Sequence, residues 1–176
     1  MYWLRIIAVF LLVALVRATI VPALEVGRAA PDLLLLVAIH VAVREPLQKR
    51  WRWSAFWVGW AAGLMVDLYS PGSHLPLGVT ALVFGLVTMA MSKLGEELYL
   101  DSAVAQILIV GPVCLLAHGV LGVVLMVHTG VPASVVLGAA LGAACYSGLV
   151  APLVFAALRP LEKFLGIRSR RSFGRA

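Results

Sequence analysis

Long apolar runs, separated by short polar or basic connections, dominate the hydropathy pattern of the chain. A transmembrane helix needs about 20 mostly apolar residues to cross a hydrocarbon core about 30 Å thick. Five runs reach or approach that length: Ile6–Leu24, Trp53–Tyr69, Leu75–Met91, Ala103–Val127 and Val131–Leu158. Together with a shorter sixth run, Pro31–Val43, the pattern predicts an all-α membrane protein, a bundle of six transmembrane helices.

The short run Pro31–Val43 decides between six spans and five. It crosses the bilayer only if its ends extend to about Ala29 and Leu47, with a flanking arginine reaching the headgroups. Pro31 and Asp32 suit a helix start, since proline is tolerated in the first turn and a carboxylate favours the positive end of the helix dipole. The alternative is a re-entrant segment, which must be sheltered by protein. Because the chain is small, we prefer six spans.

The basic residues orient the predicted bundle, because cytoplasmic loops carry an excess of lysine and arginine. With both termini cytoplasmic, twelve of the 14 basic residues lie inside, Arg28 lies outside, and Arg17 is embedded in the first span. Five spans give the same tally, so charge does not separate the two topologies. We predict one transmembrane domain, residues 1–163, and a basic cytoplasmic tail, residues 164–176.

Composition supports a lipid environment. Apolar residues make up 62% of the chain and charged residues 12%, which is about half the charged fraction of a soluble domain. Mean hydropathy is +1.03. The net charge of +6 raises the question of nucleic acid, but the basic residues lie between apolar runs and in the tail, not on a face interleaved with aromatic residues. We therefore exclude nucleic acid as a partner and expect membrane lipids to surround the chain.

Four polar residues fall at membrane depth near the outer side of the predicted bundle: Arg17, Asp32, Asp67 and His74. Ionisable groups in this environment cost about 2.5–3.5 kcal/mol each on insertion scales, and they seek partners. We expect Arg17 to pair with Asp32 or Asp67. Such a cluster fixes helix packing, holds a solute or ion, or contacts a partner, and the sequence leaves these three interpretations open.

Small residues recur at helical spacing in two spans. Gly59, Gly63 and Asp67 are four residues apart and share one helix face, and Gly138 and Gly142 repeat the spacing in the last span. Small residues at this interval let another helix approach closely, and ordinary packing within the bundle is the default interpretation. The first stripe also directs Asp67 towards a protein contact and away from lipid.

Residues that carry chemistry are scattered. His40, His118 and His128 do not form a metal-binding pattern, and Cys114 and Cys145 lie within apolar runs, where they act as small packing residues. No Ser–His–Asp set, paired glutamates or phosphate-binding loop is visible. We assign no catalytic, cofactor or metal site and expect a protein that is not an enzyme.

Several short motifs accompany this pattern along essentially the whole chain. They are Pro31-Asp32 followed by Leu33–Leu36, Gly59, Gly63-Leu64, Asp67-Leu68, Ser70-Pro71-Gly72, Pro76-Leu77-Gly78, Ala81-Leu82, and Ala151-Pro152-Leu153 before the basic tail. In this set the chain resembles the bacterial rod shape-determining protein MreD family, and the block from Gly59 to Leu82 is the most specific part.

The resemblance implies a function that the residues alone do not. Proteins of this family belong to the cell-elongation machinery of the bacterial inner membrane. They associate with the bitopic protein MreC, and through it with an actin-like filament and the peptidoglycan synthases of the lateral wall. The family is also similar in fold to the six-helix substrate-binding subunits of energy-coupling-factor transporters. It offers no catalytic residues to carry over and implies no cofactor.

The resemblance suggests a non-catalytic scaffold that binds MreC and helps position lateral peptidoglycan synthesis to maintain rod shape. We expect a partner's transmembrane helix to dock on exposed small-residue stripes, with outer-loop residues adding contacts. The structural or partner-contact candidates are Arg17, Asp32, Gly59, Gly63, Asp67, Pro71, Gly72, Pro76 and Gly78.

The alternative function is that of a small-solute-binding membrane subunit of a transporter, suggested by the shared fold and the polar cluster. It predicts an enclosed polar cavity and tight binding of a solute. The scaffold predicts a closed or lipid-filled interior and stable association with another membrane protein. An intramembrane enzyme would need an inward-facing nucleophile and base, which the sequence does not offer.

Overall fold

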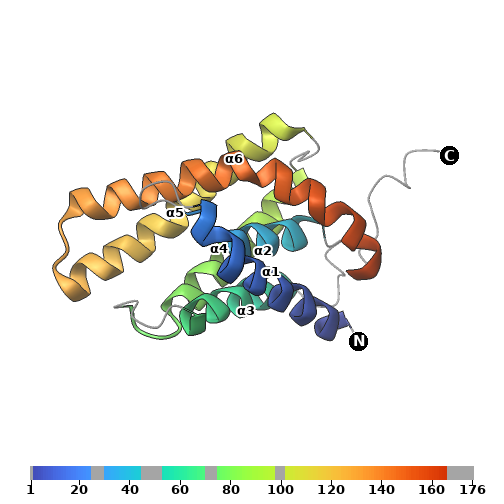
Figure 1. Ribbon diagram of the computed structural model, residues 1–176, viewed down its shortest axis with the longest axis horizontal. Helices are drawn as coiled ribbons and strands as arrows, with labels where there is room; N and C mark the ends of the chain where they lie inside the picture. The colour runs from blue at the N-terminus through green and yellow to red at the C-terminus, as the bar shows by residue number, and fades with distance from the viewer. Residues whose placement is uncertain (1, 25–29, 45–52, 70–74, 98–101, 166–176) are drawn as a thin grey trace.

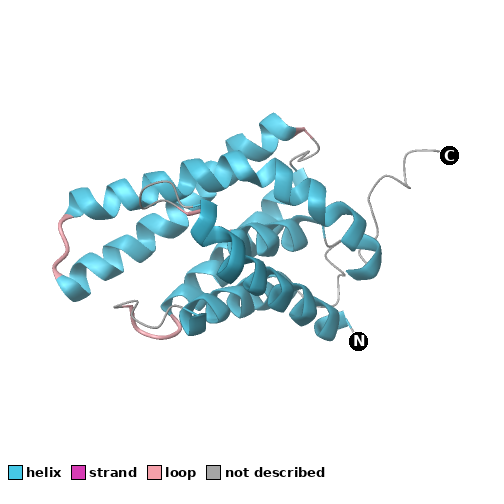
Figure 2. Ribbon diagram, in the orientation of Figure 1, coloured by secondary structure: helices cyan, strands magenta, loops and turns pink. Residues whose placement is uncertain are grey.

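The computed structural model describes residues 2–24, 30–44, 53–69, 75–97 and 102–165 (Figure 1). Within these ranges it contains six helices and no strand (Figure 2). The helices are α1 (Tyr2–Leu24), α2 (Leu33–Arg44), α3 (Ser54–Tyr69), α4 (Val79–Glu97), α5 (Ala103–Thr129) and α6 (Ala133–Leu165). The predicted all-helical fold with six helices is confirmed.

The short helix α2 lies at the centre of the molecule. Nine of its 12 residues are buried, and it packs against α1, α3, α4 and α6. A helix that is apolar on every side is typical of such a buried position. Its length is about 18 Å at 1.5 Å per residue, and its surroundings are protein instead of hydrocarbon. The expectation that this small chain could not shelter a short segment is therefore wrong; the proposed extension to Ala29 and Leu47 lies outside the described residues.

The last four helices form two hairpins, α3–α4 and α5–α6. The two helices of each hairpin pack closely against each other. In the first hairpin the glycine stripe of α3 faces α4. A Cβ on Gly63 would lie 2.5 Å from the carbonyl oxygen of Thr80 and 2.6 Å from Cα of Ala81. Thr88 Oγ1 lies 2.8 Å from the carbonyl oxygen of Ala55 and joins the two helices at the other end. The α3 stripe is thus filled by α4, which is the ordinary packing within the bundle that the spacing predicts; the further expectation that this stripe is exposed for a partner helix is wrong.

The turn between α3 and α4 shortens the predicted fourth span. We expected a helix from Leu75, but α4 begins at Val79. Gly78 has φ +94°, a backbone conformation that does not continue into a right-handed helix, so the helix starts after it. The Gly78 N–H donates to Asp67 Oδ2 at 2.8 Å, which ties the turn to the end of α3.

Replacing Gly78 by alanine should destabilise this turn. A Cβ at Gly78 would meet nothing within 4 Å, so the cost is backbone strain at positive φ, about 1–2 kcal/mol. Chemical or thermal denaturation of the purified protein measures it. The neighbouring Leu77→Ala, at a position 73% exposed, is the control and should change stability little. Equal stability of the Gly78 variant and the wild type would contradict the role of the turn.

The second hairpin carries the two described helices that are long and apolar enough to cross a membrane, Ala103–Thr129 and the Ala133–Leu161 part of α6. Only 28% and 33% of their apolar windows are buried, so most of this surface faces outwards, as lipid-facing helices require. α6 extends to Leu165, past the predicted end at Leu158, and contains Pro152 and Pro160. The predicted tail beyond it lies outside the described residues.

Candidate functional site

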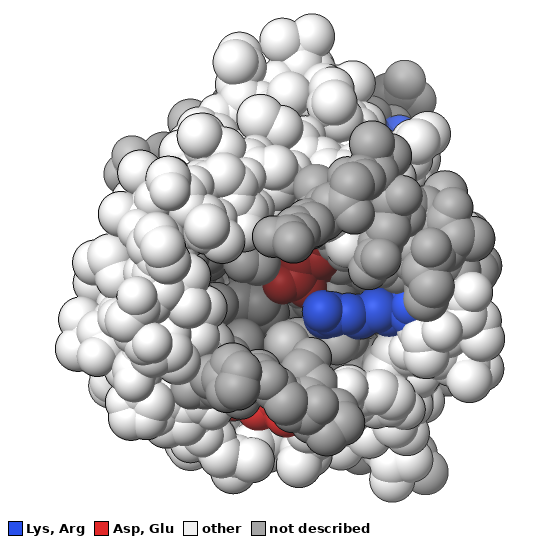
Figure 3. Space-filling view, turned by 60° about the vertical axis from the view of Figure 1, so that its left-hand side comes forward, with Lys and Arg blue, Asp and Glu red and all other residues white. Residues whose placement is uncertain are grey.

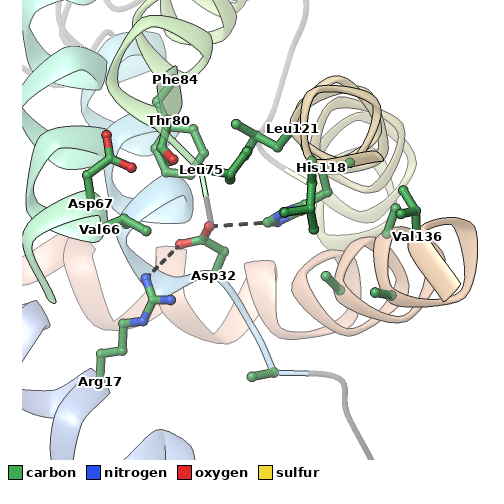
Figure 4. A pocket seen from close by; sticks show the side chains of 16 residues that line it. Arg17, Asp32, Val66, Asp67, Leu75, Thr80, Phe84, His118, Leu121 and Val136 are labelled. Carbon is green, nitrogen blue, oxygen red and sulfur yellow. Dashed lines mark ion pairs between the residues drawn. The ribbon is translucent and has the colours of Figure 1, made fainter. Parts of the chain in front are cut away.

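The predicted polar cluster forms around Asp32. Arg17, from the C-terminal half of α1, places Nη1 3.5 Å from Asp32 Oδ1 (Figure 4). The expected pairing of Arg17 with one of two carboxylates is thereby confirmed, and the partner is Asp32. Asp67 instead accepts the backbone N–H of Gly78.

Asp32 is almost completely buried, at 5% exposure, because it precedes the central helix α2. Its Oδ1 accepts the N–H of Leu35 at 3.3 Å, which caps the first turn of α2. Its own N–H donates to Ser147 Oγ of α6 at 3.0 Å. One residue therefore connects the start of α2 to α1 and α6.

His118 of α5 completes the cluster, with Nε2 3.7 Å from Asp32 Oδ2. Sequence reasoning treated His118 as one of three scattered histidines and passed over Ser147. Arg17 and His118 both lie in the C-terminal halves of α1 and α5, and that shared placement was a usable signal. Ser147 carried no signal, since a serine in an apolar helix is unremarkable.

A cavity of about 330 Å³ opens beside this cluster, between the α3–α4 hairpin and the α5–α6 hairpin; we call it the interhairpin cavity. Arg17, Asp32, Asp67, Thr80 and His118 supply its polar lining. The α5–α6 wall is apolar and includes Leu121, Leu125, Val136, Ala139 and Ala140. The surface is hollowed at a place where acidic and basic side chains face each other (Figure 3).

Two nitrogen atoms of the cluster are buried and make no hydrogen bond to the described part of the chain, Arg17 Nη1 and His118 Nε2. Their separations from Asp32, 3.5 and 3.7 Å, exceed the roughly 2.7–2.9 Å of a charge-assisted hydrogen bond. The Asp32 carboxylate therefore leaves the hydrogen-bonding capacity of these two nitrogen atoms incompletely used. The Arg17–Asp32 ion pair and the contact of His118 with Asp32 hold the helices together while these two nitrogen atoms make no hydrogen bond to the described chain.

The other predicted residues lie elsewhere. Gly59 and Gly63 lie in the contact between α3 and α4, and Pro76 and Gly78 lie in the turn before α4. Pro71, Gly72 and His74 fall outside the described residues. Whether any of them contacts a partner stays a prediction.

The geometry does not resemble a catalytic centre. Ser147 and His118 both contact Asp32, but Ser147 Oγ accepts the backbone N–H of Asp32, whereas a triad needs the histidine between serine and aspartate. In the described parts of the chain, no group of three His, Cys, Asp or Glu residues is placed to hold a metal ion.

Fold and cluster together define a helical membrane protein in which a buried carboxylate joins several helices beside a cavity. The chain belongs to the MreD family: the family of rod shape-determining protein MreD matches residues 1–159. No curated protein and no solved structure matches the chain, so the similarity to energy-coupling-factor subunits stays a prediction. Membership makes the chain a membrane protein of the complex that determines rod shape.

Proposed function

We propose that this protein is a non-catalytic inner-membrane scaffold of the rod complex. It binds an MreC-like bitopic membrane protein and helps to position the peptidoglycan synthase complex during lateral wall synthesis. Family membership supports the setting, and one structural observation supports the mode of binding: the small-residue stripe of α6 is open at Gly138, whereas that of α3 is occupied.

The α6 stripe is suited to a close-packed helix. Gly138 is exposed, and a Cβ built on it would meet nothing within 4 Å. Exposed Leu137 and Leu141 flank it, and Gly142 continues the stripe one turn later. A small residue between larger apolar ones lets a second helix approach the backbone and bury side chains on both sides. The sequence offered both stripes for a partner helix; we place it on α6, because α4 fills the stripe of α3.

The arrangement also supports six spans with both termini cytoplasmic. Successive helices reach the interhairpin cavity with alternating ends: the C-terminal parts of α1, α3 and α5 and the N-terminal parts of α2, α4 and α6. In Figure 1 the start of α1 and the end of α6 lie at the same side of the molecule. Trp53, Phe56 and Trp57 near the start of α3 pack edge to face, where an aromatic belt at the cytoplasmic interface would sit.

Substitution of Gly138 by leucine tests the proposed interface. Because the position is open, the variant should accumulate and fold normally but recover several-fold less MreC-like partner in gentle-detergent co-purification, and cells should lose rod shape. Gly119→Leu on α5 is the matched control, since a Cβ there also meets nothing within 4 Å. Equal partner recovery with both variants would remove α6 as the interface, and a wild-type chain that recovers no such partner would overturn the scaffold itself.

One observation favours the small-solute alternative, namely the interhairpin cavity with its charged lining. Its α5–α6 wall is apolar, which a wholly polar solute would leave without matching contacts. A solute retained through purification, with no membrane protein partner recovered, would favour this alternative over the scaffold.

A further inference from the structure

We propose that the interhairpin cavity binds the headgroup of a zwitterionic, amine-bearing phospholipid. The ammonium group lies at the carboxylate of Asp67, the phosphate lies at Arg17 and His118, and one acyl chain leaves along the α5–α6 wall. This ligand site is independent of the partner interface on α6.

The charged side chains that line the cavity favour a ligand with a cationic group. Among the described residues of the lining, Arg17 carries a positive charge and Asp32 and Asp67 carry negative charges. Arg17 pairs with Asp32, and no described residue forms an ion pair with Asp67. An ammonium group beside Asp67 gives this carboxylate a positive partner with three N–H donors.

Two nitrogen atoms of the lining that make no hydrogen bond to the described residues favour a ligand that also carries an oxygen acceptor. Arg17 Nη1 and His118 Nε2 are buried without a hydrogen bond to the described chain. Both line the cavity and converge on the same carboxylate (Figure 4). Phosphate oxygens accept such charge-assisted bonds well, and a guanidinium holds them in a fixed geometry. A molecule carrying both ammonium and phosphate matches both halves of the lining at once.

The apolar wall indicates that this molecule is an amphiphile. Leu121, Leu125 and Val136 form one side of the cavity. Ala139 and Ala140 belong to the same side, and their short side chains leave space in it. A volume of about 330 Å³ is at the lower end for ligand pockets, so it accommodates a headgroup and the beginning of a chain but not a whole lipid. A bilayer phospholipid can leave its remaining chain among the lipids that surround α5 and α6.

The test compares two lipids with identical acyl chains and phosphate, phosphatidylethanolamine and phosphatidylglycerol. Native mass spectrometry of the purified full chain in detergent, titrated with each lipid, should show the ethanolamine lipid bound about tenfold more tightly, the scale of one favourable ionic contact. Equal binding, or a preference for the glycerol lipid, would overturn the proposal. So would soluble glycerophosphoethanolamine that binds as tightly as the lipid, because the apolar wall would then contribute nothing.

Two variants locate the site. Asp67→Asn keeps a side-chain oxygen for the Gly78 N–H and removes only the charge, so the preference for ethanolamine should disappear. Ala139→Phe fills the cavity from an exposed position on α6 and should abolish binding of both lipids while the protein folds. Lys93→Gln, which removes an exposed charge outside the cavity, is the control and should bind as the wild type does. Unchanged preference in folded Asp67→Asn, or unchanged binding in Ala139→Phe, would show that the lipid sits elsewhere. Partner recovery is measured separately, so failure here leaves the scaffold proposal standing.

Discussion

Replacing Gly63 by alanine should lower the free energy of unfolding by about 2–3 kcal/mol, the usual cost of forcing a methyl group into a filled contact. The added Cβ would lie 2.5 Å from the carbonyl oxygen of Thr80 and 2.7 Å from the backbone nitrogen of Ala81. These neighbours are backbone atoms of α4, which cannot rotate away as a side chain would. The hairpin must therefore open, and thermal unfolding of the purified variant should begin at a clearly lower temperature.

A matched control separates this effect from helix propensity. Alanine is favoured over glycine inside a helix by up to about 1 kcal/mol. Gly119 also lies inside a helix, and a Cβ on it would meet nothing within 4 Å. Gly119→Ala should therefore leave stability unchanged or raise it. If both variants lose the same stability, close packing between α3 and α4 is not the reason for glycine at position 63.

Loss of the Asp32 carboxylate should have the second large effect. Asp32→Asn removes the charge opposite Arg17, whose side chain is 29% exposed, and should cost about 2–4 kcal/mol. Breaking a fully buried ion pair typically costs 3–5 kcal/mol, and the partial exposure of the arginine reduces that figure. Asn retains an oxygen for the Leu35 N–H, so Asp32→Ala should cost about 1 kcal/mol more through loss of the helix cap.

A double-mutant cycle distinguishes the ion pair from general packing. The cost of Asp32→Asn arises mainly from leaving the Arg17 charge without its counter-ion. When Arg17→Gln is already present, Asp32→Asn should cost markedly less, and the coupling energy should exceed about 1 kcal/mol. Strictly additive losses in thermal or chemical unfolding would mean that the two residues stabilise the bundle separately.

The sequence by itself determined the helices. Five apolar runs that approach the length of a membrane span and one shorter run predict helices, because lipid offers the backbone no hydrogen-bonding partner, and these six runs correspond to the six helices of the described residues. It also determined that Arg17 needs a carboxylate at its own depth, since a charge there is costly when unpaired. The family followed from local motifs around Gly59–Leu82, and its match covers residues 1–159.

Only the tertiary structure decided which surfaces are used. Spacing alone makes the glycine stripes of α3 and α6 equivalent, but α4 fills the first and Gly138 stays open, because the choice depends on how the hairpins pack. The same holds for the polar cluster: His118 and Ser147 reach Asp32 only because α2 lies at the centre, with α5 and α6 crossing its start. Hydropathy and spacing report on one helix at a time, whereas a site shared by several helices depends on their relative placement.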